Sequence, residues 1–489
     1  MSASIRFDDL PVLENVLDMF DVEHALDWDE RSQLAETCSY LICDYIQENP
    51  FVFSQPSYKS IIKEAVMTLI EETVTPACGT LAEEEMDLIF QMAAYSVFTH
   101  IVPRRSYRNT FVRKQMSESR RELISKKLDN IRARPQAEQC TEQWYIDRWN
   151  RLSGSNAYKA FGSQSQVNSL ILEKCKPLNT AKYKSVNVES PLHHGKRFEQ
   201  VSTMLYEFLY ETKIEEFGCV PHQVHSFIGA SPDGIVVNKD SPRYGRMLEI
   251  KNVTSRKING IPKEDYWVQM QIQMEVCDLN ECDFLETEMF TYDSYEEFEK
   301  DGTFQKSESG KYKGIIMFFI VDGAPYYEYP PFQCSQAEYE QWEEEMMVKH
   351  QSHTWNCNIY YRIDTISCVL VLRNKMWAKA AVDRLREVWD IILYERENGY
   401  EHRMPKQRIV KGPTKTNVIK LDGSEATEMI DYNDNNNGPA PCVLNKSDNQ
   451  GTQPNMQKRQ RQSCDALDNG DNSVENNPTT LFVETETIT

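Results

Sequence analysis

The sequence lacks any apolar run of the roughly 18 residues that a membrane-spanning helix needs. Its N-terminal stretch, MSASIRFDDLPVLENVLDMF, carries acidic side chains where a secretory signal peptide needs a basic flank. The 13 cysteines form no CxxC pair and no His cluster accompanies them, which excludes the common zinc-site patterns. We therefore expect an intracellular protein that is not secreted, has no membrane partner and keeps its thiols reduced.

Positive charge is also scarce, because the formal net charge is −21, and this by itself argues against a nucleic-acid partner. The acidic residues are unevenly distributed. Residues 1–102 contain four Lys/Arg against nineteen Asp/Glu, and residues 411–489 contain seven against twelve. The middle of the chain is therefore close to neutral, which leaves room for a locally positive DNA-binding surface there.

The chain divides by composition into four predicted segments. Residues 1–102 show apolar residues at three- and four-residue steps and are predicted to form an acidic helical domain. Residues 103–135 carry eleven Lys/Arg against three acids and are predicted to be a basic helical linker. Three interpretations of that linker stay open: a solvated charged helix, a contact to the DNA backbone, or a clamp between domains.

The remaining two segments differ sharply from each other. Residues 136–410 mix helix and strand patterns, which predicts an α/β (α+β) domain whose mixed central sheet is flanked by helices. Residues 411–489 are rich in Asn, Asp, Gly, Gln and Thr, and such a composition cannot bury enough apolar surface to fold. We expect a disordered tail there.

The stretch GASPDGIVVNKDSPRYGRMLEIKN, residues 229–252, carries the chemistry. Glu249 and Lys251 are two apart on a predicted strand and therefore point to one face, and a hairpin can bring Asp233 to the same face. Two carboxylates meeting there would repel each other unless a hard cation such as Mg²⁺ lay between them, with the carbonyl of Ile250 as a further oxygen ligand. The alternative is an ordinary hairpin with a surface Glu–Lys pair.

Two further features favour a functional site over that alternative. Glu199 lies in HHGKRFEQ, which begins an upstream helix, and Gln271 lies in the downstream helix YWVQMQIQM. The blocks SPDG, LEIK and the YWVQMQIQM helix occur in this order. Together they resemble the YqaJ-type viral recombinase nucleases, the family of phage lambda exonuclease within the PD-(D/E)XK fold. The resemblance covers about residues 140–292 and is strongest to the versions carried by large DNA viruses.

The resemblance implies a restriction-endonuclease-like core with a defined set of site residues. Asp233 and Glu249 would bind Mg²⁺, for which Mn²⁺ could substitute, and Glu199 would border the metal. Lys251 would position the attacking water and Gln271 would hold water or phosphate.

A block upstream, WYIDRWNRLSGSNAY, is similar to the part of the family that grips a terminal 5′-phosphate. It places Arg148 and Ser155 in that role, with Arg151 as an alternative reader and Gly154 where the family often has Ala. Arg suits the role because its planar fork can hold a phosphate with two hydrogen bonds.

Several nearby side chains allow more than one interpretation. Packing or DNA-facing roles are favoured over metal binding for the histidines, because hard-metal nuclease sites prefer oxygen ligands; these are His193, His194, His222 and His225. Trp267 could contact DNA, although core packing is the commoner fate of such a residue.

The resemblance implies a Mg²⁺-dependent 5′-to-3′ exonuclease that acts on double-stranded DNA ends in recombination, repair or genome processing. It also implies a single-strand annealing protein as partner, a ring-like homo-oligomer and, for a viral protein, a location in the host cytoplasm or nucleus. Two alternatives remain open: a structure- or site-specific endonuclease on the same fold, and a non-catalytic DNA-binding protein with a relic fold.

Overall fold

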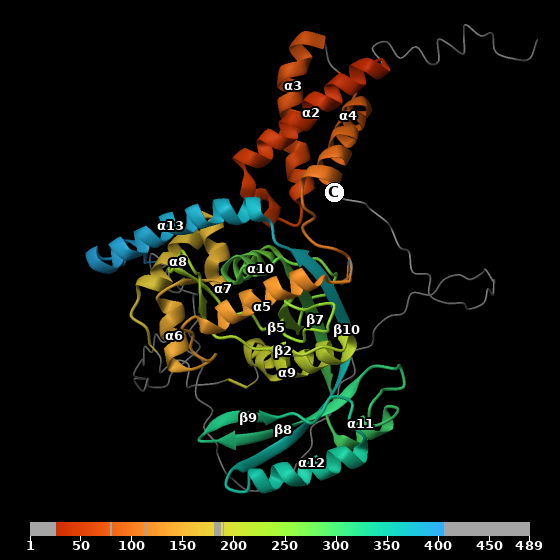
Figure 1. Cartoon of the computed structure of the whole chain (residues 1–489), viewed down its shortest axis with the longest axis vertical. Helices are drawn as coiled ribbons and strands as arrows, with labels where there is room; N and C mark the ends of the chain where they lie inside the picture. The colour runs from red at the N-terminus through yellow and green to blue at the C-terminus, as the bar shows by residue number, and fades with distance from the viewer. Residues whose placement is uncertain (1–25, 79–80, 113–114, 180–186, 189, 405–489) are drawn as a thin grey trace, which may run out of the picture. The chain divides into compact units, whose positions relative to one another are not determined.

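The structure, a computed structural model, describes residues 26–404 apart from 79–80, 113–114, 180–186 and 189 (Figure 1). All of these residues belong to one compact unit, Met1–Arg408. The predicted disordered tail and the first 25 residues of the predicted helical domain lie outside the described residues, so both stay predictions. None of the helices in the described ranges is long and apolar enough to cross a membrane.

The described part of the chain begins with helices, as the three- and four-residue apolar spacing predicts. They are α2 (Trp28–Glu48), η2 (Pro50–Ser54), α3 (Tyr58–Cys78), α4 (Glu83–Ser96) and η3 (Val97–Ile101). A capping box between Asp27 and Glu30 starts α2, and the buried side of this helix repeats along Ala35, Cys38, Ile42 and Ile46. Proline usually breaks a helix, but Pro76 lies within α3, which continues to Cys78. A proline in the last turn removes one backbone donor and leaves few residues to disrupt.

A seven-stranded mixed sheet forms the centre of the fold, which confirms the predicted class. Its order is β2 (Ile214–Glu215), β5 (Gly234–Val236), β6 (Met247–Val253), β7 (Glu281–Thr291), β10 (Thr354–Leu372), β8 (Lys313–Val321) and β9 (Ala324–Glu328). The pair β6–β7 is parallel, whereas the other neighbours in this order are antiparallel. A connection between parallel strands needs a crossover, and α10 (Glu264–Cys277) provides it.

A second sheet joins three short strands in the order β1 (Leu152–Ser153), β4 (Ile228–Ala230) and β3 (Val220–Pro221). The segment VHSFIGASPDGIVV therefore contributes two strands, β4 and β5, to different sheets. The Ser231-Pro232-Asp233 link turns the chain from one sheet to the other.

Two helices cover opposite faces of the central sheet (Figure 1). On one face, Tyr206 of α9 (Pro191–Tyr210) packs with Leu248, Ile250 and Leu285. On the other face, Phe284 joins the apolar residues of α10 in a common core. Since side chains alternate along a strand, the face that carries Phe284 also carries Glu249 and Lys251.

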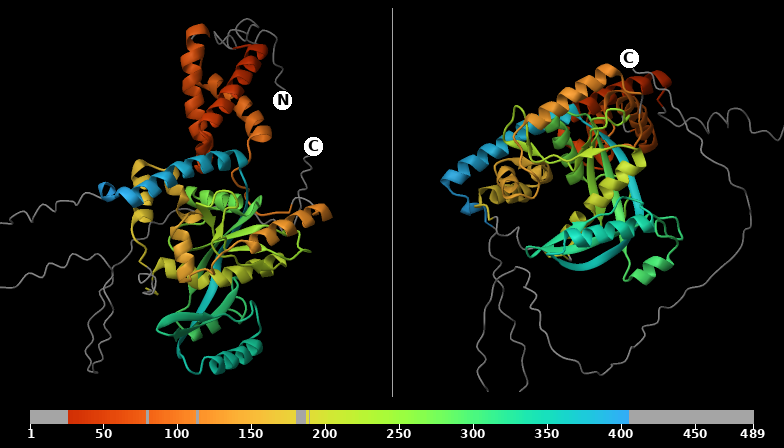
Figure 2. Two further views of the ribbon diagram at one scale, coloured as in Figure 1. Left: turned by 60° about the vertical axis from the view of Figure 1, so that its left-hand side comes forward. Right: turned by 60° about the horizontal axis from the view of Figure 1, so that its bottom comes forward.

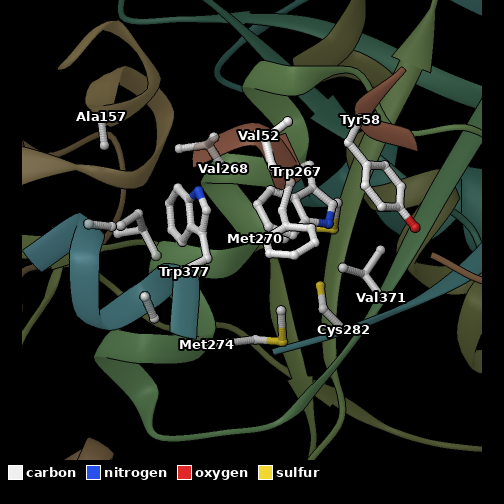
Figure 3. Close-up of a cluster of buried hydrophobic side chains, with 14 of the residues drawn as sticks. Val52, Tyr58, Ala157, Trp267, Val268, Met270, Met274, Cys282, Val371 and Trp377 are labelled. Carbon is white, nitrogen blue, oxygen red and sulfur yellow. The ribbon is translucent and has the colours of Figure 1, made fainter. Parts of the chain in front are cut away.

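An aromatic core joins α10 to α13 (Lys375–Asn398) and to η2. The rings of Trp267 and Trp377 meet edge to face with their centroids 5.3 Å apart (Figure 3). Phe51 of η2 lies 6.4 Å from Trp377, again edge to face. Trp267 is therefore a core residue, and of its two interpretations packing is the one that holds.

The basic segment contacts acidic residues of the core. Three side chains of α5 (Glu118–Ala133) form ion pairs with carboxylates of the α/β domain. Arg120 pairs with Glu281 at 2.8 Å, Lys127 with Asp278 at 2.8 Å, and Arg132 with Glu215 at 2.6 Å. Upstream, the buried Arg105 donates to the carbonyls of Phe53 and Ser54 at 3.2 and 2.9 Å. These contacts favour the clamp among the three interpretations of this segment.

The strand β10 is long enough to serve two partners. Residues 361–372 pair with β7, whereas residues 354–362 pair with β8. The helices α11 (Tyr295–Lys300) and α12 (Gln336–Lys349) lie, together with β8 and β9, beside the half of β10 that pairs with β8 (Figure 2). Tyr339 of α12 packs there with Ile315 of β8 and Phe298 of α11.

Candidate active site

The turn into β5 fixes the first acidic residue of the site. Gly234 pairs with Leu248, so Asp233, one residue earlier, lies across from β6. Its Oδ2 accepts a hydrogen bond from the backbone N–H of Ile250 at 2.7 Å. Gly234 is required here, because a Cβ at this position would lie 2.1 Å from the Cγ2 of Ile214 in β2. The predicted approach of Asp233 to the strand of Glu249 is confirmed.

Glu249 and Lys251 form an ion pair on one face of β6, as their spacing predicts. Glu249 is fully buried, whereas the side chain of Lys251 is 25% exposed. The Lys251 ammonium also lies over the ring of Tyr266, 5.1 Å from its centroid. Lys251 is therefore held between a carboxylate and an aromatic ring, with one side open to solvent.

Glu199 reaches this site from α9. A hydrogen-bond network fixes that helix on the sheet: Asn252 donates to the carbonyl of Gly195 at 2.8 Å and accepts from the hydroxyls of Ser202 and Thr287 at 2.7 and 2.6 Å. We call Asp233, Glu249, Glu199 and Lys251 the β6 cluster.

Electrostatics show that the β6 cluster has an excess of carboxylates. Burial raises the pKa of Asp233 well above its usual value, and the charges of Glu249 and Glu199 raise it further. Burial likewise raises the pKa of Glu199, with Glu249 among the groups that add to the shift. The pKa of Lys251 is raised although burial opposes this, because Glu249 and Asp233 stabilise its charge. One lysine therefore faces three carboxyl groups.

The donor set of the β6 cluster suits a hard divalent cation. Among the described residues, no group of three or more His, Cys, Asp or Glu side chains is arranged to hold a metal ion. Mg²⁺, however, needs only one or two carboxylates from a protein and keeps several waters. Asp233 and Glu249 can supply these, and their repulsion is the feature that a cation would relieve. The ligand roles of Glu199 and of the Ile250 carbonyl stay predictions.

The structure does not bring Gln271 to the β6 cluster. Its side chain is fully buried, donates to the carbonyl of Leu372 at 2.9 Å and accepts from the N–H of Asn374 at 2.7 Å. It therefore links α10 to the end of β10. The sequence contained a signal for this placement, because Trp267 precedes Gln271 by one helical turn and so lies on the same face of α10. That face packs into the core, where Trp267 is buried.

Gln273, which the sequence reasoning missed, occupies the expected position instead. It donates to Oε2 of Glu249 at 2.7 Å and to the carbonyl of Ser231 at 3.3 Å. Its buried Oε1 has no hydrogen-bond partner among the residues that the structure describes. Gln273 lies two residues beyond Gln271, about 200° around the helix. Gln271 therefore faces the packed core at the end of β10, whereas Gln273 faces Glu249.

The residues predicted to grip a phosphate lie together at the junction of α6 (Glu142–Trp149) and α7 (Gly154–Ala157). Arg148 donates to the hydroxyl of Ser155 at 2.7 Å, and its guanidinium lies 4.3 Å from the ring centroid of Trp144. Trp144 donates in turn to the hydroxyl of Ser231 at 3.1 Å, which connects this junction to the turn before Asp233. We call Trp144, Arg148 and Ser155 the α6–α7 corner.

Gly154 and Arg151 have structural explanations at this corner. A Cβ on Gly154 would lie 3.3 Å from the carbonyl oxygen of Gln269, so a small residue lets α7 approach α10 closely. Arg151 donates to the carbonyl of Asp147 at 3.1 Å and lies 3.6 Å from its carboxylate. Its engagement with Asp147 favours Arg148 over Arg151 as the phosphate reader.

The histidines have packing and hydrogen-bonding partners. His193 shares a hydrogen bond with the hydroxyl of Tyr327 at 2.5 Å, and the ring of His194 packs 4.8 Å from that of Phe198. His222 accepts at Nδ1 from the backbone N–H of His225 at 3.0 Å. These contacts agree with the packing roles that the sequence favoured.

Comparison with known proteins locates this site within a recognised domain. Residues 143–280 match the YqaJ-like viral recombinase domain, which confirms the resemblance drawn from the sequence motifs. An uncharacterised protein of Acanthamoeba polyphaga mimivirus is 29% identical over 365 residues, which cover 67% of this chain and 64% of that protein. The chain therefore matches somewhat less than two thirds of this relative's length.

Among solved structures, the chain is similar to an alkaline exonuclease from Laribacter hongkongensis. The similarity has a TM-score of 0.31 and 16% identity, and it covers 53% of this chain and 95% of that one. The same exonuclease in complex with dAMP matches with a TM-score of 0.30 and 16% identity over 54% of this chain and the whole of that one.

Proposed function

We propose that this chain is a Mg²⁺-dependent deoxyribonuclease that degrades double-stranded DNA from its ends in the 5′-to-3′ direction. The observation that carries the proposal is the convergence of Asp233, Glu249 and Lys251 on one face of β6, with more carboxylates than cations. The match to a YqaJ-like viral recombinase domain over the same residues supports it.

The residues of the β6 cluster divide the work of phosphodiester hydrolysis. Bound Mg²⁺ would act as a Lewis acid on the phosphate and lower the pKa of a coordinated water. Asp233 and Glu249 would hold the ion, and Gln273 orients Glu249 by donating to its Oε2. Lys251, with its raised pKa, stays protonated and can orient the attacking water and offset the negative charge that develops on the phosphate.

The α6–α7 corner supplies end recognition in this proposal. A 5′-phosphate would accept hydrogen bonds from Arg148 and from the Ser155 hydroxyl, which already contact each other. The Trp144–Ser231 hydrogen bond ties this corner to the turn that carries Asp233. Binding at the corner would therefore place the first phosphodiester bonds near the β6 cluster.

The direct test is digestion of 5′-phosphorylated linear duplex DNA by the full chain in Mg²⁺, with product mapping. We expect processing from 5′ ends that leaves 3′ single strands, while covalently closed circles survive and EDTA stops the reaction. Efficient cutting of closed circles would favour an endonuclease on the same fold. DNA binding without any metal-dependent hydrolysis would favour the non-catalytic alternative.

A second test addresses the 5′-phosphate. Arg148→Ala should reduce the preference for 5′-phosphate over 5′-hydroxyl ends by about ten- to a hundredfold, since a hydrogen bond to a charged group is worth about 1.5–3 kcal/mol. The ratio of kcat/KM for the two ends measures this, and an unchanged ratio would contradict the assignment of Arg148. A single-strand annealing partner, a ring-like oligomer and action in viral recombination, repair or genome processing belong to the same proposal.

A further inference from the structure

Two cations from other helices bind the carbonyls at the C-terminal end of α6. Lys174 of α8 (Gln164–Cys175) donates to the carbonyl of Arg148 at 2.5 Å, and Arg396 of α13 donates to that of Trp149 at 2.9 Å. The last carbonyls of a helix lack partners within the helix and carry a partial negative charge. Lys174 and Arg396 therefore bind the end of the helix that carries the predicted phosphate reader.

The same contacts fasten the three helices to one another. Arg396 donates from Nε to the carbonyl of Lys174 at 2.9 Å, and its guanidinium lies 3.7 Å from the ring centroid of Trp149. Trp149 donates to the carbonyl of Lys176 at 3.0 Å. Figure 1 shows α13 running beside α8. A shift at the end of α13 would therefore be transmitted to Arg148 through two hydrogen bonds.

The arrangement is electrostatically costly without an anion. Lys174 is only 3% exposed. Burial lowers its pKa to about 7; Glu173 opposes this shift, and the charges of Arg148 and Arg396 add to it. The hydrogen bond from Lys174 to the Arg148 carbonyl and the charge of Glu173 offset only part of this cost. A phosphate dianion at the α6–α7 corner would offset the repulsion among these cations.

We propose that Lys174 and Arg396 are positioning residues that hold Arg148 in place and raise the affinity of the α6–α7 corner for a terminal 5′-phosphate. The inference rests on the proposed function, because it concerns the same corner. It extends that function to α13, which lies beyond the matched residues 143–280. The two cations act through the main chain of α6 and through their charge.

The test measures binding, so that it does not depend on hydrolysis. In a full chain carrying Asp233→Asn, with EDTA present, the Kd values of a 5′-phosphorylated and a 5′-hydroxyl duplex are compared. Arg396→Gln and Lys174→Met should each reduce the preference for the phosphorylated end by about tenfold. The matched control is Arg384→Gln, on the same helix, whose side chain also donates to a main-chain carbonyl, that of Ala160, at 3.1 Å. It should leave the preference unchanged.

Further readouts separate positioning from general damage. A loss of folding would weaken binding to both ends equally, whereas the proposal requires a selective loss for the phosphorylated end. Arg396→Lys keeps the charge and should retain more of the preference than Arg396→Gln. An unchanged preference in both Arg396→Gln and Lys174→Met overturns the inference, and so does a parent protein that binds both ends equally. Failure of the wild-type chain, with Asp233 intact, to hydrolyse DNA in Mg²⁺ would instead count against the proposed nuclease.

Discussion

Two buried acidic clusters lie on adjacent strands of the same sheet, and their charges are arranged differently. The β6 cluster sets three carboxyl groups against one lysine. The β7 cluster, which we define as Asp283, Glu281, Arg243 and Arg246, sets two carboxylates against two arginines. The register pairs Leu248 with Asp283, so Asp283 lies close to Glu249 but points to the opposite face of the sheet.

The β7 cluster is satisfied by its own neighbours. Asp283 is fully buried and accepts hydrogen bonds from Arg243, from the hydroxyls of Tyr206 and Thr110, each at 2.6 Å, and from Arg246 at 3.3 Å. The β6 cluster, by contrast, holds two acids whose pKa values are raised. Balanced buried charges stabilise a fold, whereas an unbalanced set is typical of a functional site.

The largest expected effect is the loss of hydrolysis when the β6 cluster loses a metal ligand. Asp233→Asn keeps an oxygen that can accept from the Ile250 N–H but removes a charge, so hydrolysis should fall by on the order of 10²–10³-fold. The free energy of unfolding should stay equal or increase, because one repelling carboxylate is gone. Steady-state hydrolysis and urea unfolding measure the two effects. A destabilised variant that still hydrolyses DNA would remove the distinction between the clusters.

The β7 cluster should give the opposite result. Asp283→Asn leaves Arg243 and Arg246 buried without a full counter-charge and should lower the free energy of unfolding by about 3–5 kcal/mol. Hydrolysis per folded molecule should persist at low temperature. Asp129→Asn is the control, because Asp129 pairs with Arg132 on the surface and should cost less than about 1 kcal/mol. Equal losses of unfolding free energy in Asp283→Asn and Asp129→Asn would show that the β7 cluster is not structural.

The two glutamines of α10 repeat the comparison on a smaller scale. Gln273→Leu removes the donor to Glu249 and should lower hydrolysis by about 10- to 100-fold with a modest change in stability. Gln271→Leu leaves the Leu372 carbonyl and the Asn374 N–H unpaired and should cost about 1–3 kcal/mol of stability instead. The exchange of these two outcomes would restore the original assignment of Gln271.

The smallest effect concerns pH. Burial opposes ionisation of Glu281, but Arg246 and Arg120 bind its carboxylate, and the net result is a lowered pKa. A group whose pKa is lower in the folded state stabilises the fold above its unfolded pKa of about 4.5, and this contribution disappears as the pH falls through the folded pKa. Between pH 6 and 3, the free energy of unfolding should therefore fall less in Glu281→Gln than in the wild type, by roughly 1 kcal/mol. Parallel curves for the variant and the wild type would contradict this.

Strand periodicity explains why the core of the site was predictable. The two-residue spacing of Glu249 and Lys251 determines that they share a face of β6, and the turn before Gly234 brings Asp233 within reach of the same strand. The helix α10 offered no such guide, because its sequence YWVQMQIQM places glutamines at every second residue. This spacing distributes them around a helix with 3.6 residues per turn.

Local spacing and the order of the blocks along the chain were enough to predict the fold class and the shared face of Glu249 and Lys251, and the family resemblance implied that Arg148 and Ser155 grip a phosphate. The packing of the helices places Gln273 rather than Gln271 beside Glu249 and brings Lys174 and Arg396 to the end of α6. Those contacts join segments as much as 247 residues apart in the chain. Local periodicity carries no information about such contacts, because they depend on how the helices pack.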